Sequence, residues 1–141
     1  MTNLENWKVI EKRQVIYGTV PSKSNCYQIV TFKSKASGKS HASLAKTKYL
    51  KQYEKDFYIQ CNLYRNANIE GYFQFDADVY YPNQRSDLDN SAKVLLDCLQ
   101  QIGAFANDNK MVCLRMNKFL DKLNPRVEFV ITAVMPQLEL A

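Results

Sequence analysis

The stretch GYFQFDADVYYPNQRSDLDNSAKVLLDCLQQIG, residues 71–103, determines the fold expected for this chain. Apolar and polar residues alternate from Gly71 to Tyr81, which predicts a strand with one buried face. The second half of the stretch carries apolar residues at helical spacing, which predicts an amphipathic helix that ends at Gly103. The apolar stripe of this helix consists of Leu88, Ala92, Leu95, Leu96, Leu99 and Ile102.

The regions on either side add further strands and a second helix. β-Branched and aromatic residues predict strands at residues 13–19 and 27–33. A broad apolar face predicts a helix over residues 44–64, and two more strands are expected at residues 111–118 and 126–134. The expected fold is therefore α+β, with a mixed β-sheet of about four to five strands packed with two main helices.

Composition indicates one folded domain over residues 1–141, in which residues 1–12 are expected to form an extended or flexible segment. The chain is 46% hydrophobic and 23% charged, which excludes a disordered protein. No apolar run approaches the length of a membrane span, and the first residues do not resemble a signal peptide. The four cysteines form no Cys-x-x-Cys pair, so free thiols and a cytoplasmic location are expected.

Charge is distributed unevenly along the chain. The formal net charge is +5, but residues 20–55 carry eight lysines and one acid, Glu54, for a local net charge of +7. This excess favours a polyanionic partner such as nucleic acid. A solubilising surface is the alternative interpretation of the same lysines.

Three acidic residues around the helix at residues 88–102 are the candidate chemical groups. Asp87 and Asp89 lie at its expected start, where both carboxylates can converge on one point beyond the helix end. Asp108 follows the other end of the helix, so it joins them only if its loop folds back or if a second subunit supplies it. Carboxylates without a partner histidine suit Mg²⁺ or Mn²⁺, and Lys93, one turn after Asp89, points its ammonium toward the same place. A helix-capping role for the acids, with an Asp89–Lys93 ion pair, remains the structural alternative.

These residues resemble the motif of the RusA family of Holliday junction resolvases. The matching positions are Asp87-Leu88-Asp89-Asn90, Lys93, Asp97, Gly103 and Asp108. The chain departs from the family pattern at Asn107, where the family has the first acid of an Asp-Asp pair. It also departs at Ser86, where the family often has a basic residue.

The resemblance implies a Mg²⁺-dependent endonuclease that cuts four-way DNA junctions as a homodimer, in DNA recombination and repair. Asp87, Asp89 and Asp108 would hold the metal, for which Mn²⁺ can substitute, and Lys93 would be the catalytic or phosphate-contacting lysine. Branched DNA is the expected partner, with no membrane and no organic cofactor. The residues expected to contact DNA are Lys23, Lys46, Lys48, Arg85 and Lys118.

The same sequence features are compatible with two other functions. One is a non-catalytic basic DNA-binding protein of phage type, which would be indifferent to EDTA. The other is a small structural or interaction protein, in which the acidic helix start only caps the helix.

Overall fold

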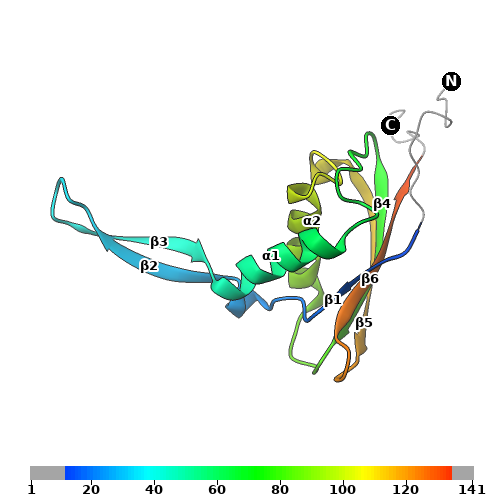
Figure 1. The fold of residues 1–141 in the computed structure, drawn as a ribbon, viewed down its shortest axis with the longest axis horizontal. Coiled ribbons are helices and arrows are strands. Elements are labelled where there is room, and N and C mark those ends of the chain that lie inside the picture. The colour runs from blue at the N-terminus through cyan, green and yellow to red at the C-terminus, as the bar shows by residue number, and fades with distance from the viewer. Residues whose placement is uncertain (1–11, 135–141) are drawn as a thin grey trace.

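The computed structural model describes residues 12–134. A four-stranded sheet with two helices on one face forms the body, and a separate two-stranded sheet extends away from it (Figure 1). Within the described residues no helix is long and apolar enough to cross a membrane. The segment expected at residues 1–12 falls almost entirely outside the described residues.

The four-stranded sheet has the order β1-β6-β4-β5. Its strands are β1 (Gln14–Tyr17), β4 (Phe73–Tyr81), β5 (Met111–Leu120) and β6 (Arg126–Ala133). β6 runs antiparallel to both β1 and β4, whereas β4 and β5 are parallel and are joined through helix α2 (Leu88–Gln101). The α+β class and the mixed sheet are confirmed.

The alternation of apolar and polar residues in β4 coincides with an alternation of buried and half-buried positions. Every second residue from Phe73 to Tyr81 is buried, and the residues between them are half-buried. The buried side faces α2 and helix α1 (Lys48–Gln60). Phe129 of β6 lies inside this core, in contact with the rings of Phe57, Tyr64 and Phe75.

Helix α2 begins and ends where the sequence predicts. Half of its residues are buried, and Ala92, Leu95, Leu96 and Leu99 of the apolar stripe are among them. Gly103 follows the helix with a φ of +79°, a conformation that residues with a side chain rarely adopt. A Cβ at this position would also lie 3.1 Å from the Asn66 side chain, so this glycine permits both the turn and the close approach.

The helix predicted over residues 44–64 was wrong at its start. Ser40–Lys46 form strand β3, which pairs antiparallel with β2 (Tyr27–Lys33), whereas the sequence indicated the start of a helix at residue 44. The helix begins only at Lys48, because the Thr47 side chain caps it by accepting a hydrogen bond from the Leu50 amide. β2 and β3 form the two-stranded sheet that projects from the body, and we call this hairpin (residues 27–46) the arm.

All four cysteines are free thiols, as expected. Cys26, Cys61 and Cys98 are buried and Cys113 is half-buried.

Candidate active site

The start of helix α2 presents two acidic side chains at the surface. Asp87 occupies the N-cap position in an extended conformation, and its side chain makes no capping hydrogen bond. An N-cap aspartate normally accepts such a bond from an amide of the first turn. Asp89 lies in the first turn and is exposed, with one carboxylate oxygen accepting from the Asn90 amide at 2.9 Å. Both residues therefore keep carboxylate oxygens available to a ligand at the positive end of the helix dipole.

Two side chains of the sheet hold the loop that leads to these acids. The ammonium of Lys118 on β5 donates to the carbonyl oxygens of Gln84 at 2.9 Å and Ser86 at 2.7 Å. It also lies over the ring of Tyr81, 5.5 Å from its centroid. The Tyr81 hydroxyl hydrogen-bonds in turn to Ser91 in α2 and to the carbonyl oxygen of Asp87. The backbone on both sides of Asp87 is thus fixed by groups from β4 and β5.

The electrostatics of Tyr81 place both acids near its hydroxyl. Burial raises the pKa of Tyr81, and the negative charges of Asp87 and Asp89 add to that effect while the Ser91 hydrogen bond opposes it. Tyr81 is therefore a neutral hydrogen-bonding group at physiological pH. No motif in the sequence indicated a role for Tyr81 or Ser91, or contacts of Lys118 with the loop. Only the position of Tyr81 as the last inward residue of the alternating strand pointed to it.

Lys93 lies between acids on the exposed side of α2. Asp89, Lys93 and Asp97 are all exposed and follow one another at intervals of one helical turn. Burial raises the pKa of Asp97, Lys93 lowers it, and the charge of Asp108 raises it again. Asp108 is thus an electrostatic neighbour of Asp97, which lies about 12 Å along the helix from Asp89.

Within one chain, Asp108 lies near the start of β4, whereas Asp87 and Asp89 lie beyond its end. It begins the short 3₁₀ turn η3 (Asp108–Lys110), directly before Met111, which pairs with Phe73 at the start of β4. Asp87, in contrast, follows the end of β4, and the ends of this nine-residue strand are about 26 Å apart. No group of three His, Cys, Asp or Glu side chains within residues 12–134 is arranged to hold a metal ion. Within one chain, the loop therefore does not bring Asp108 to the other two acids.

Asn107, the departure from the family pattern, has a structural role in this loop. Its side-chain oxygen accepts from the Asn109 amide at 3.0 Å and so caps the short turn that carries Asp108.

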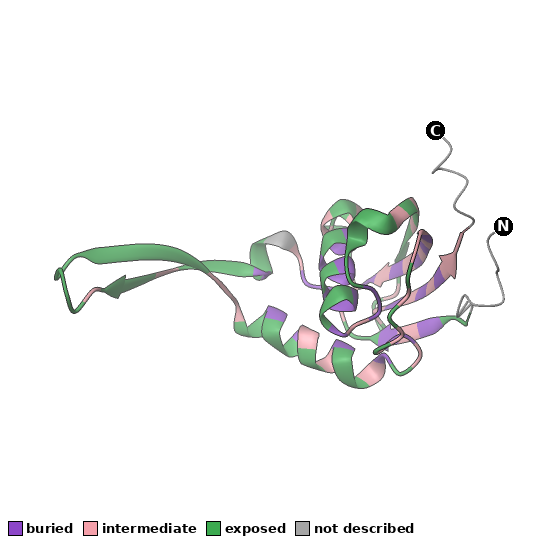
Figure 2. Ribbon diagram, turned by 90° about the horizontal axis from the view of Figure 1, so that it is seen from above, coloured by how far each residue is buried: buried purple, intermediate pink, exposed green. Residues whose placement is uncertain are grey.

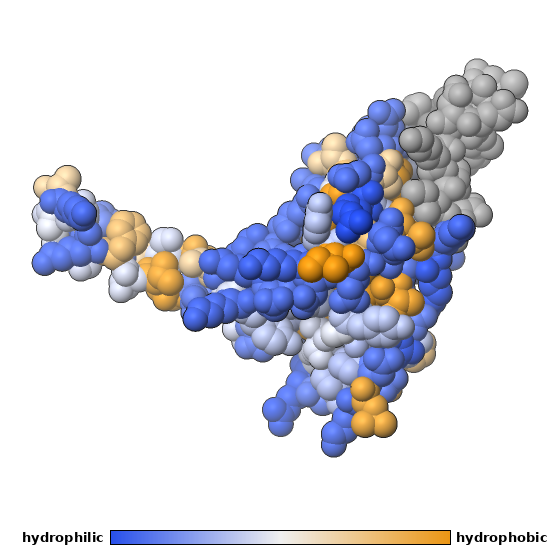
Figure 3. Space-filling model, in the orientation of Figure 1, coloured by the Kyte–Doolittle hydropathy of each residue, from blue (hydrophilic) through white to orange (hydrophobic). Residues whose placement is uncertain are grey.

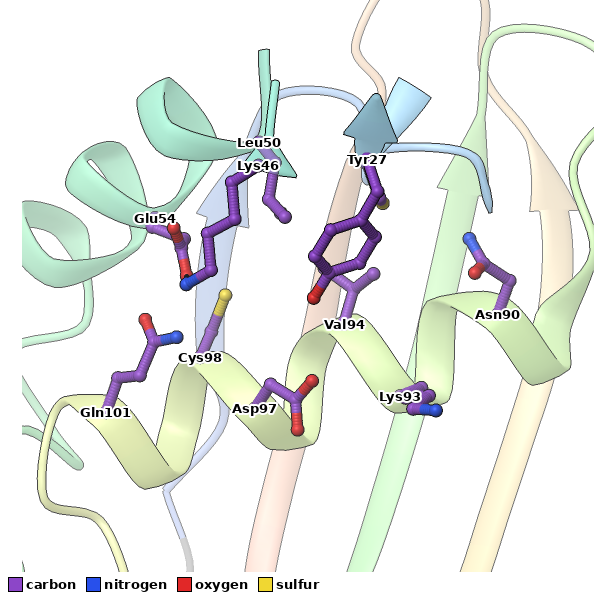
Figure 4. Close-up of a pocket in the computed structure, with 11 residues that line it drawn as sticks. Tyr27, Lys46, Leu50, Glu54, Asn90, Lys93, Val94, Asp97, Cys98 and Gln101 are labelled. Carbon is purple, nitrogen blue, oxygen red and sulfur yellow. Dashed lines mark hydrogen bonds and ion pairs between the residues drawn. The ribbon is translucent and has the colours of Figure 1, made fainter. Parts of the chain in front are cut away.

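A cavity of about 330 Å³ adjoins the exposed side of α2 (Figure 4). Its lining comes from the base of the arm, from α1 and from α2. The residues that matter here are Tyr27, Lys46, Glu54, Asn90, Lys93 and Asp97. Asn90 also donates to the carbonyl oxygen of Pro21 at 3.2 Å, which ties α2 to the segment that enters the arm. Burial raises the pKa of Cys98 in this lining to about 12, so it is a neutral thiol and not a nucleophile at physiological pH.

The residues expected to contact DNA are spread over several elements. Lys23 belongs to a short 3₁₀ turn before the arm, while Lys48 and Arg85 are exposed. Lys46 forms an ion pair with Glu54 at 2.7 Å, and this hydrogen bond raises the pKa of Lys46. Lys118 holds the loop described above. DNA contact by these residues stays a prediction.

A comparison with known protein families identifies the chain. The model of the endodeoxyribonuclease RusA matches residues 25–132, which extend from the arm through α1, β4, α2 and β5 into β6. The chain belongs to the RusA family. No curated protein matches the chain significantly.

Membership of the family indicates the type of reaction in which the acidic residues at the start of α2 would take part. RusA proteins are endodeoxyribonucleases of the Holliday junction resolvase type, so this chain is a member of a nuclease family that acts on branched DNA. The matched region contains Asp87, Asp89, Lys93 and Asp108 as well as Tyr81 and Lys118.

Proposed function

We propose that this protein is a Mg²⁺-dependent endonuclease that resolves four-way DNA junctions by paired phosphodiester cleavage, in DNA recombination and repair. The observation that carries the proposal is the uncapped Asp87 carboxylate beside the exposed Asp89 at the start of α2. Tyr81 and Lys118 hold the backbone that presents them. A helix that needed these acids only as caps would use the Asp87 side chain as one, and it does not.

The two acids fit a magnesium ion. Mg²⁺ is commonly held by one or two carboxylates together with phosphate oxygens of the substrate. Bound there, the ion would activate water and neutralise the charge that develops on the phosphate. Lys93, exposed one turn along the helix, would contact the same phosphate and stabilise this charge. In the reaction, the oxygen of water bonds to phosphorus, the bond to the 3′ oxygen breaks, and that oxygen takes up a proton. The products are a 5′-phosphate and a 3′-hydroxyl.

We further propose that the active form is a homodimer in which a second copy of the chain supplies Asp108. Asp108 lies far from Asp87 along β4 within one chain, and it is exposed. A four-way junction has approximate two-fold symmetry and needs paired nicks, so a C2 dimer with two equivalent sites would match it.

The substitution Asp89→Asn tests the nuclease assignment. It removes one ligand charge without changing the size of the side chain, so junction binding should persist while Mg²⁺-dependent cleavage falls at least about 10³-fold. Asp56→Asn in α1 is the matched control, and it should cleave as the wild type does. Full Mg²⁺-dependent cleavage by the Asp89→Asn protein would refute the assignment.

The alternative is a non-catalytic DNA-binding protein. The separation of Asp108 from the other acids within one chain is the observation that favours it. Such a protein would bind junctions equally well in EDTA and would show no cleavage with Mg²⁺ or Mn²⁺.

A further inference from the structure

The arm is a separate structural unit that projects from the body of the protein. Its two strands of seven residues each pair over their whole length, from Tyr27 opposite Lys46 to Lys33 opposite Ser40. Seven residues of strand extend about 20 Å. Nearly the whole arm is exposed (Figure 2).

One face of the arm is apolar although it lies in solvent. Directly paired residues of antiparallel strands point to the same side, and this side alternates along the strand. Ile29 and Leu44 therefore share a face, and they are 74% and 72% exposed. Tyr27 and Lys46 continue the same face at the base of the arm, where both line the cavity beside Lys93 of α2. We call the set Tyr27, Ile29 and Leu44 the apolar face of the arm.

The tip of the arm is basic. Lys33, Lys35 and Lys39 are exposed, and within residues 12–134 none of them forms an ion pair, in contrast to Lys46 with Glu54. Figure 3 shows hydrophilic side chains at the end of the arm. The sequence contains no acid from Pro21 to Tyr53. Such a surface attracts a polyanion and repels a second copy of itself.

An isolated two-stranded sheet is marginally stable in water, and exposed aliphatic side chains of this size favour a binding partner. The charge of the arm selects nucleic acid as that partner. A DNA strand that follows the apolar face toward the body reaches the cavity and Lys93. Proteins that unstack DNA insert apolar side chains against the faces of bases. The centre of a four-way junction can present such faces, whereas an intact linear duplex presents them only at its ends.

We propose that the arm is the branch-point-binding element of the protein: its apolar face lies against base-pair faces at the centre of a DNA junction, and its tip lysines contact phosphates. This inference rests on the proposed function and names the part of the chain that distinguishes a junction from a duplex.

Binding measured in EDTA with the full chain tests the inference separately from catalysis. In the variant Ile29→Thr/Leu44→Thr, threonine keeps the strand propensity and removes apolar surface. Junction affinity should fall about tenfold or more, which is the loss of affinity that one mismatched base pair typically causes in a protein–DNA complex. Affinity for a linear duplex should not change. Val30→Thr, on the opposite face of the same strand, is the control and should bind both DNAs as the wild type does.

The triple variant Lys33→Gln/Lys35→Gln/Lys39→Gln tests the tip. It should lose affinity for junction and duplex, and the slope of log K against log salt should decrease by about 3. These lysines are exposed, so the substitutions leave the body of the fold intact.

Three results would overturn the inference. One is unchanged junction affinity in the Ile29→Thr/Leu44→Thr variant, and another is an equal loss for junction and duplex. The third is a shift of this variant from dimer to monomer in sedimentation, which would assign the apolar face to a second copy of the chain. Mg²⁺-dependent cleavage by the wild type remains a separate readout, so failure of the arm and failure of the nuclease assignment are distinguishable.

Discussion

The arm and the body of this protein use apolar residues in opposite ways. In the body, the aromatic and aliphatic side chains of β4, β6 and α2 are buried around Phe129. In the arm, Ile29, Phe32 and Leu44 remain more than half exposed. Hydrophobic burial therefore determines the structure of the body, which presents a fixed site at the start of α2. The arm lacks that constraint, so its apolar residues are available to a partner.

A pair of matched substitutions provides the strongest contrast between the two regions. Phe129→Ala removes a fully buried ring from the core and should destabilise the protein by about 3–5 kcal/mol. Phe32→Ala in the arm should leave the stability of the body unchanged. The Phe32 ring is 56% exposed, and His41 is the only ring that it stacks on within residues 12–134. Denaturant unfolding followed by far-UV circular dichroism measures the free energy of unfolding of both variants. Equal losses would show that the arm and the body unfold as one cooperative unit.

Lys118 tests whether the body positions the site. Lys118→Met removes both hydrogen bonds to the loop before Asp87, and a small displacement of that loop should lower kcat about 10²-fold. Junction affinity should stay within about twofold of wild type, and the Mg²⁺ concentration for half-maximal cleavage should rise.

The conservative variant Lys118→Arg keeps the charge and the donors and should recover part of the rate. If Lys118→Met instead weakens junction binding in proportion to cleavage, Lys118 is a direct DNA contact, as the sequence analysis expected.

The face of the sheet opposite the helices should contribute a smaller, pH-dependent effect. Hydrogen bonds from Arg13 and Arg126 lower the pKa of Glu128, with burial opposing them. A carboxyl with a lowered folded-state pKa stabilises the protein above its unfolded pKa, near 4.5, and loses this contribution as pH falls through the folded value. Glu128 is close to the surface, so the effect should be at most about 1 kcal/mol.

Unfolding measured from pH 7 to pH 3 detects this contribution. Stability of the wild type should decline in the acidic range more steeply than that of Glu128→Gln, which cannot titrate at this position. Identical declines would mean that the ion pairs of Glu128 contribute nothing to folding.

The sequence predicted the body much better than the arm, for a physical reason. Strand β4 and helix α2 bury one face each, so the periods of their apolar residues report their conformations directly. Strand β3 buries little and contains no β-branched residue, and it is held by pairing with β2, a long-range contact that no local pattern records. The segment Ser40–Lys46, which consists mostly of serine and alanine, therefore gave no strand signal.

The candidate site shows the same division. Local capping and helical spacing predicted where Asp87, Asp89 and Lys93 lie along α2, and the structure has them there, while their roles stay a prediction. The location of Asp108 depends on the parallel pairing of β4 and β5, which local spacing does not determine. The contacts of Lys118 with the loop depend on the same pairing, because Val79 lies opposite Lys118 in that register.

Mixed dimers test the central claim, that the carboxylates of two copies of the chain complete each site. Asp89→Asn and Asp108→Asn chains, each inactive alone, are co-expressed with different tags so that dimers containing one of each can be isolated. If sites are shared between copies, one site of every mixed dimer retains both Asp89 and Asp108, and the mixed dimers should nick a four-way junction with Mg²⁺ at about half the wild-type rate per dimer. If the mixed dimers remain as inactive as either parent, the two acids do not act together across the subunits, and the proposed site is wrong.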